Sequence, residues 1–104
     1  MNAVFRALDD PTRRKILELL HNGDLSAGEI AEKFAMTRPS ISHHLDILKQ
    51  ANLVVAVRQG QYQVYSLNLS VVDETIQWML SIGVRKPRKK KISSLQKTRQ
   101  FRTV

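Results

Sequence analysis

The sequence predicts a mainly α-helical domain of five helices with one small β-hairpin. Three observations support this fold class. Apolar residues recur at three- and four-residue spacing in several short segments. Residues that favour helix starts precede those segments, and β-branched and aromatic residues gather in two runs on either side of Gln59-Gly60. The chain has 104 residues, 42% of them hydrophobic, so it can form one domain with a modest core.

The first two helices are expected on either side of a break at Asp10-Pro11. Residues 3–8 form a short apolar helix that ends at this break. Asp10 suits the N-cap of the second helix, and Pro11 suits its first position because its missing N–H would have no helical partner there. The second helix runs to about His21, and Gly23 follows its end.

Arg13, Arg14 and Lys15 stand in the first turns of this second helix, where the helix dipole disfavours positive charge. A neighbouring acid such as Glu18 would offset them, or they would bind phosphate groups of a partner. A solvated surface is the remaining interpretation. We take Arg13 and Arg14 as candidate phosphate contacts.

A third and a fourth helix are expected next, joined by a short turn. Ser26 and Glu29 have the spacing of a capping box, which starts the third helix. Residues 35–37 form the turn, and Thr37 can cap the fourth helix. Ile41, Leu45 and Leu48 then lie on one face of that helix.

The opposite face of the fourth helix carries polar side chains, together with one proline: Pro39, Ser42, His43, Asp46 and Gln50. Short hydrogen-bonding side chains near a helix N-terminus suit the base edges and phosphates of a DNA major groove, although an ordinary solvated face has a similar composition. Two short helices, a three-residue turn and a polar second helix predict a helix-turn-helix, with a plain αα-hairpin as the alternative.

The hairpin is expected from residues 54–57 and 62–67, with Gly60 supplying the positive φ of the turn. A hairpin directly after a recognition helix is a wing, so the full prediction is a winged helix-turn-helix. Arg58 and Gln61 flank the tip, where an arginine can enter a minor groove or hold a phosphate. A solvated strand-end residue is the alternative for Arg58.

The last helix is expected at about residues 71–83, with Ser70 as its cap. Its apolar residues cover a wider arc than a single core-facing stripe needs. One part of the arc would contact the body and the other a second copy, giving a two-fold homodimer; a deeper monomer core is the alternative. The predicted interface consists of Val4, Phe5, Leu8, Val72, Ile76, Met79 and Leu80. Such a dimer would place two recognition helices about one DNA turn apart on a partly palindromic site.

The net charge of +8 is concentrated at one end of the chain. Residues 1–84 hold eight Lys/Arg and nine Asp/Glu, whereas residues 85–104 hold nine Lys/Arg and no acid. We therefore predict a DNA-binding and dimerisation domain at 1–84 and a disordered basic tail at 85–104. The tail would add sequence-independent DNA affinity, hold an acidic partner or anionic membrane surface, or only improve solubility.

Several functional classes are disfavoured by the composition. There is no cysteine, so neither disulfides nor thiolate metal sites are expected. No apolar run is long enough to span a membrane, and the N-terminus lacks the layout of a signal peptide, so a cytoplasmic, nucleoid-associated location is expected. Catalysis is not expected either, because the neighbouring Ser, His and Asp residues of the fourth helix point in different directions. No cofactor is predicted.

Several linked motifs resemble the ArsR-type bacterial repressors, and within them the SdpR-like autorepressors. The motifs are Asp10-Pro11-Thr12-Arg13-Arg14-Lys15-Ile16-Leu17, Leu25-Ser26-Ala27-Gly28-Glu29-Ile30-Ala31, Ser40-Ile41-Ser42-His43-His44-Leu45-Asp46-Ile47-Leu48, and Arg58-Gln59-Gly60-Gln61. The resemblance covers residues 2–82. It implies a winged-helix homodimer that represses transcription and has its first and last helices at the dimer interface. It also assigns DNA recognition to Thr37, Arg38, Ser40, Ser42 and His43, with Arg58 in the wing.

The sequence differs from the family pattern at the metal-sensing positions. Many relatives sense metals through Cys pairs in the third helix or Asp/His sets in the last helix. Here the third helix has no cysteine and the last has no histidine, so metal sensing is not expected. Of the histidines, His44 lies near the buried face and suits a hydrogen-bonded core position, whereas His43 suits DNA contact.

The sequence therefore predicts a repressor that binds double-stranded DNA at its own promoter. The candidate DNA-binding residues are Thr37, Arg38, Ser40, Ser42, His43, Gln50, Arg58, Gln61, Arg13 and Arg14. Release would come from an anti-repressor protein or a small-molecule effector. The alternatives are a sequence-neutral, nucleoid-type protein that binds through its basic tail, and a protein-interaction module that does not bind DNA.

Overall fold

The structure is a computed structural model that describes residues 1–83. The predicted tail at 85–104 lies outside the described residues. The described residues belong to two units, Met1–Asp73 and a second unit that begins at Glu74. Within residues 1–83, no helix is long and apolar enough to cross a membrane.

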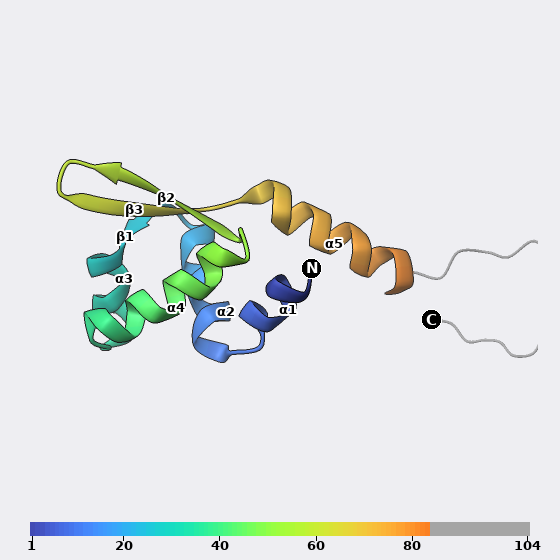
Figure 1. The fold of residues 1–104 in the computed structure, drawn as a ribbon, viewed down its shortest axis with the longest axis horizontal. Helices are drawn as coiled ribbons and strands as arrows, with labels where there is room; N and C mark the ends of the chain where they lie inside the picture. The colour runs from blue at the N-terminus through green and yellow to red at the C-terminus, as the bar shows by residue number, and fades with distance from the viewer. Residues whose placement is uncertain (84–104) are drawn as a thin grey trace, which may run out of the picture. The chain divides into compact units, whose positions relative to one another are not determined.

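Five helices and three strands follow one another along the chain (Figure 1). They are α1 (Asn2–Leu8), α2 (Pro11–His21), β1 (Leu25–Ser26), α3 (Ala27–Phe34), α4 (Arg38–Gln50), β2 (Val54–Gln59), β3 (Tyr62–Leu67) and α5 (Leu69–Gly83). The predicted class, five helices with a small β wing, is confirmed.

Helices α2, α3 and α4 begin where side chains of the preceding residues satisfy their first backbone N–H groups. The Asp10 carboxylate accepts from the N–H of Arg13 at 3.1 Å. Ser26 and Glu29 form the reciprocal capping box, with distances of 3.2 and 2.9 Å. The Thr37 hydroxyl accepts from the N–H of Ser40 at 3.3 Å. All three predicted caps are confirmed.

The sheet has three strands, in the order β1-β3-β2, where the sequence predicts only the two strands of the hairpin. Leu25 and Ser26 pair antiparallel with Tyr65 and Val64. A strand of two residues shows no alternation of polar and apolar side chains, and its partner is distant in sequence, so no local pattern could predict it. The pairing joins the segment before α3 directly to the wing.

The core of the first unit lies between the sheet and the helices. Ile16, Ile30, Ile41, Leu45 and Leu48 are all fully buried, each at 0% exposure. They come from α2, α3 and α4, and the three residues from α4 are those predicted to form its inner face. The opposite face of α4 is thereby fixed toward the outside.

Helix α5 begins earlier than predicted. The backbone N–H of Val72 donates to the carbonyl of Asn68 at 3.2 Å, and the helix starts at Leu69. Ser70 therefore lies inside the first turn and is not the cap. The helix follows β3 after a single residue, which leaves no room for a separate capping segment before Ser70.

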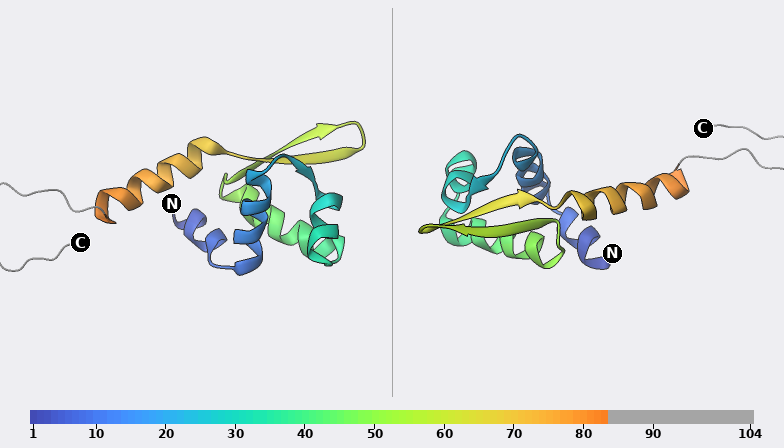
Figure 2. Two further views of the ribbon diagram at one scale, coloured as in Figure 1. Left: turned by 180° about the vertical axis from the view of Figure 1, so that it is seen from behind. Right: turned by 90° about the horizontal axis from the view of Figure 1, so that it is seen from above.

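The wing and the start of α4 lie at the same end of the first unit. Figure 1 shows the strands as a layer over α2, α3 and α4, and Figure 2 shows from two further directions that the turn of the hairpin reaches the end where α4 begins. Residues at the N-terminus of α4 and at the tip of the wing are therefore available to the same partner.

Candidate nucleic-acid interface

The outer face of α4 is the central feature of the candidate interface. Pro39, His43, Asp46 and Gln50 are exposed, and Ser42 is partly buried at the edge of the face. Because the buried residues Ile41, Leu45 and Leu48 lie on the other side, α4 cannot turn this polar face inward. The structure therefore brings together most of the α4 residues that the sequence singled out.

Two hydroxyl groups are ordered at the N-terminus of α4. The Thr37 hydroxyl accepts from the Ser40 N–H and also donates to the Ser40 hydroxyl at 3.1 Å. Each hydroxyl oxygen has two lone pairs, and the first N–H groups of a helix attract anions. This end of α4 has the chemistry of a phosphate contact.

Arg38 begins α4 and lies over the start of α3. Its Nη1 atom would be 3.5 Å from a Cβ added to Gly28, so the glycine leaves the guanidinium room at an ordinary contact distance. Arg38 is exposed. A planar guanidinium in this position can donate to a phosphate or a guanine edge.

The wing presents Arg58 and Gln61 beside its turn. Arg58 pairs across the hairpin with Gln63, and Gly60 adopts φ 63° in the turn, as expected for glycine. Both Arg58 and Gln61 are exposed. The predicted position of these residues at the tip is confirmed, whereas their contact with DNA stays a prediction.

Charges on α4 reach the phenol of Tyr65 in β3. Burial raises the pKa of Tyr65 above its ordinary value, the Asp46 carboxylate acts in the same direction, and the Arg38 guanidinium opposes both. The Tyr65 hydroxyl donates to the Gln63 side-chain oxygen at 3.4 Å. Charged side chains of α4 therefore act on a residue of the wing.

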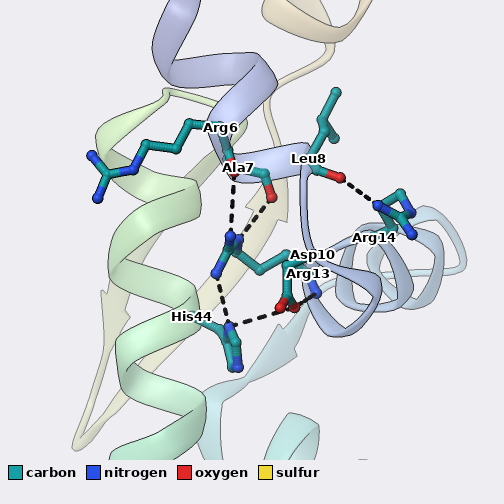
Figure 3. A network of polar contacts seen from close by, with 7 residues as sticks. All are labelled: Arg6, Ala7, Leu8, Asp10, Arg13, Arg14 and His44. Atoms are coloured by element: carbon teal, nitrogen blue, oxygen red, sulfur yellow. Dashed lines mark hydrogen bonds and ion pairs between the residues drawn. The ribbon is translucent and has the colours of Figure 1, made fainter.

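Arg13 and Arg14 have internal partners at the end of α1 (Figure 3). Arg13 donates from Nε to the carbonyl oxygen of Ala7 at 2.7 Å and from Nη2 to that of Arg6 at 3.2 Å. Arg14 donates from Nη1 to the carbonyl oxygen of Leu8 at 2.6 Å. The last carbonyls of a helix carry the negative end of its dipole, which explains why positive charge is favourable here.

The sequence offers three explanations for the basic cluster: an offset by Glu18, contact with external phosphates, and a solvated surface. None of them includes these contacts with α1. The guanidinium groups instead satisfy the C-terminus of α1, which is separated from the start of α2 by only two residues. That short connection is the signal that could have predicted the contact, because it forces one helix end against the next helix start. Contact of Arg13 or Arg14 with DNA stays a prediction.

His44 connects α4 to the same corner. Its Nδ1 atom lies 3.2 Å from Nη1 of Arg13 and 3.9 Å from Oδ2 of Asp10. The backbone N–H of Arg13 lowers the pKa of Asp10 below its ordinary value, and the charge of Arg13 adds to this effect. The predicted hydrogen bonding of His44 is confirmed, but the side chain is only partly buried and lies at the edge of the core, not within it.

The residues predicted to form the dimer interface differ in their solvent exposure. Val4 is 5% exposed and belongs to the core of the first unit, so it has little surface for a second copy. Leu8 and Val72 are partly buried. Phe5 on α1 and Ile76, Met79 and Leu80 on α5 are exposed, as an interface would require.

Clusters of three or more His, Cys, Asp or Glu side chains that could hold a metal ion do not occur among residues 1–83. The contact of His44 with Asp10 involves one histidine and one carboxylate. The candidate site is therefore built from hydrogen-bonding and cationic side chains.

Known proteins that resemble this chain are transcriptional regulators. Residues 10–55 match the family described as bacterial regulatory protein, arsR family. The chain is 58% identical over 81 residues to the transcriptional repressor SdpR of Bacillus subtilis (strain 168), covering 78% of this chain and 90% of that relative. It is 34% identical over 77 residues to an arsenical resistance operon repressor of Staphylococcus aureus, covering 74% of each.

Solved structures show the same fold. An ArsR-like transcriptional regulator from Rhodococcus sp. RHA1 matches with a TM-score of 0.71 and 33% sequence identity, over 79% of this chain and 77% of that chain. The predicted winged helix-turn-helix is confirmed.

Proposed function

Because the chain belongs to the ArsR family of bacterial regulatory proteins, we propose that it represses transcription by binding operator DNA as a homodimer. The observation that carries the proposal is the exposed polar face of α4, held outward by a fully buried apolar face on the same helix. The family is one of regulators, which confirms the prediction that the chain is not an enzyme.

The proposed recognition uses α4 in the major groove. Arg38, Ser42 and His43 read base edges, while Thr37 and Ser40 place the helix N-terminus against a phosphate. Gln50 contacts the far end of the same groove. Arg58 and Gln61 hold the adjacent groove from the tip of the wing.

The proposed dimer forms through α1 and α5. Exposed apolar side chains on α5, among them Ile76, Met79 and Leu80, favour burial against a second copy. A two-fold arrangement matches a partly palindromic operator with half-sites about one helical turn apart. Each subunit then contributes one α4 and one wing.

The proposed regulatory role is autorepression in the cytoplasm, at the nucleoid. Bound dimer competes with RNA polymerase for promoter DNA. The chain has no cysteine, so release does not use a thiolate metal site. An anti-repressor protein or a small-molecule effector would provide the signal.

A second candidate function is sequence-neutral, nucleoid-type binding, favoured by the nine Lys/Arg and absence of acids in residues 85–104. Such a polycation binds any duplex, and its affinity falls steeply with salt. It predicts that removal of the tail abolishes binding, whereas the repressor retains its preference without the tail.

Fluorescence anisotropy separates the two functions. Full-length protein and a 1–84 truncation are titrated with duplex from upstream of the gene and with a scrambled duplex of equal composition, at about 0.15 M salt. A preference of about 10³-fold or more by the truncation supports the repressor. A small preference, together with a truncation that no longer binds, rejects sequence-specific autorepression.

A further inference from the structure

Arg13 joins three helices through one side chain (Figure 3). It lies on α2, donates to the carbonyl oxygens of Arg6 and Ala7 on α1, and places Nη1 3.2 Å from Nδ1 of His44 on α4. A guanidinium has donors and no acceptor, so Nδ1 of His44 is the acceptor in this hydrogen bond. The two partners are 31 positions apart in sequence.

This contact reaches α4 next to the residues proposed to read DNA. Ser42 and His43 immediately precede His44. Burial of Ile41, Leu45 and Leu48 determines which face of α4 points inward, but apolar contacts have no preferred direction and tolerate small shifts along the helix axis. A hydrogen bond has a preferred length and angle, so the contact to His44 restricts such shifts.

We propose that Arg13 is a positioning residue for operator recognition, which holds α4 in its DNA-reading register through His44 and anchors that register to the end of α1. The inference rests on the proposed function. It replaces the role in phosphate contact that the sequence suggests for Arg13. All three guanidinium nitrogens have internal partners, and the side chain is partly buried.

The neighbouring basic residues provide the contrast. Arg14 is exposed and donates to the carbonyl of Leu8 at the same helix end. Lys15 is exposed in the same turn of α2. A Lys15→Gln variant therefore measures what the loss of one positive charge from this turn does to DNA binding in general.

The test uses full-length protein and a duplex that the wild type enriches from a random pool, with a scrambled duplex as the control. The variants are Arg13→Lys, His44→Phe, their double variant, and His44→Asn. Lysine keeps the charge of Arg13, but all its donors are on one nitrogen, so it cannot reproduce the planar fork by which the guanidinium reaches both α1 carbonyls and His44. Phenylalanine removes the acceptor of His44, whereas the asparagine side-chain oxygen restores an acceptor near the position of Nδ1.

We expect Arg13→Lys and His44→Phe each to lower the preference for the enriched duplex by about tenfold. The double variant should show a reduction no greater than the larger of the two single reductions, because both changes break the same hydrogen bond. His44→Asn retains most of the preference. The salt dependence of binding stays that of the wild type in all of them.

Two results would overturn the inference. The first is an unchanged preference in Arg13→Lys and His44→Phe. The second is an Arg13→Gln variant whose affinity falls equally for both duplexes and whose slope of log affinity against log salt is smaller by about one unit. Removal of a phosphate-binding cation has this effect. Lys15→Gln is the reference for the loss of one charge. Circular dichroism melts identify a variant that does not fold, and the His44→Phe and His44→Asn pair then decides. If the wild type enriches no sequence, the proposed function fails instead.

Discussion

The Thr37 hydroxyl accepts a hydrogen bond from the Ser40 backbone N–H at 3.3 Å and donates one to the Ser40 hydroxyl at 3.1 Å. The two residues therefore serve the fold and the proposed DNA contact with the same atoms. Removal of the helix cap and removal of the DNA contact must be separated in any experiment on this end of α4.

Thr37→Val should lower the free energy of unfolding by about 1 kcal/mol, because valine keeps the shape of threonine but cannot cap α4. Urea unfolding followed by circular dichroism measures the change. Thr37→Ser restores the hydroxyl and should recover most of the stability. Equal stabilities for the valine and serine variants would show that the cap contributes nothing.

His43→Ala should weaken operator binding without changing stability. The His43 side chain is exposed on the outer face of α4, so its removal creates no cavity. Removing a side chain that hydrogen-bonds a base weakens binding by about 1–3 kcal/mol and relaxes specificity at one position. Anisotropy with the enriched duplex and its single-base variants measures both effects; unchanged binding would favour the protein-interaction module.

Arg58→Ala should reduce affinity for longer duplexes more than for duplexes cut back to the recognition-helix contacts. The side chain lies beside the wing turn, where it would reach the flanking groove. Arg58→Lys, which keeps the charge, is the control for simple electrostatics. If the reduction is the same for long and short duplexes, the wing does not contact the flanking DNA.

Asp10→Asn should remove a pH-dependent part of the stability, since asparagine still caps α2 but carries no charge. The folded-state pKa of Asp10 is lowered by the Arg13 N–H. Its stabilisation is therefore present above the ordinary carboxyl pKa and is lost as pH falls through the lower folded value. The stability difference between wild type and variant should be constant above about pH 5 and shrink as the pH falls below the ordinary carboxyl pKa of about 4 in urea titrations; a difference that stays constant throughout would contradict this.

Ile76→Asp should convert the proposed dimer to a monomer that keeps its fold. Ile76 is 48% exposed in the single chain, so a carboxylate there leaves the core of the first unit intact but opposes burial against a second copy. Sedimentation equilibrium measures the change in mass, with Gln77→Asp on the same helix as the control. A dimer that survives the change would place the interface elsewhere.

The parts of the structure that depend on neighbouring residues could be predicted from the sequence. The caps at Asp10, Ser26 and Thr37 bond N–H groups three residues ahead, and the turn at Gly60 depends on its own φ. The inner face of α4 follows from helical periodicity. For these reasons the fold class and the exposed face of α4 could both be predicted from the sequence.

The parts that depend on distant residues could not be predicted. Strand β1 forms because Leu25 and Ser26 pair with Tyr65 and Val64. The role of Arg13 depends on its contact with His44. In each case the partner is far away in sequence, so residue type alone does not identify it. The sequence leaves Arg13 with a phosphate contact, an offset by Glu18 or a solvated surface, because its hydrogen bond to His44, 31 positions away, exists only in the folded chain.

The pairing of β1 with β3 has a consequence for the DNA sequence itself. Because Ser26 both pairs with Val64 and caps α3, the wing is attached to the helix that precedes the recognition helix, not only to the chain that follows it. In the proposed complex, the distance between the bases contacted by α4 and the groove contacted by the wing is then fixed within each subunit. One inserted base pair displaces the flanking groove by roughly 3.4 Å and rotates it about the DNA axis. Operators should therefore tolerate substitutions between the two contacts far better than insertions or deletions.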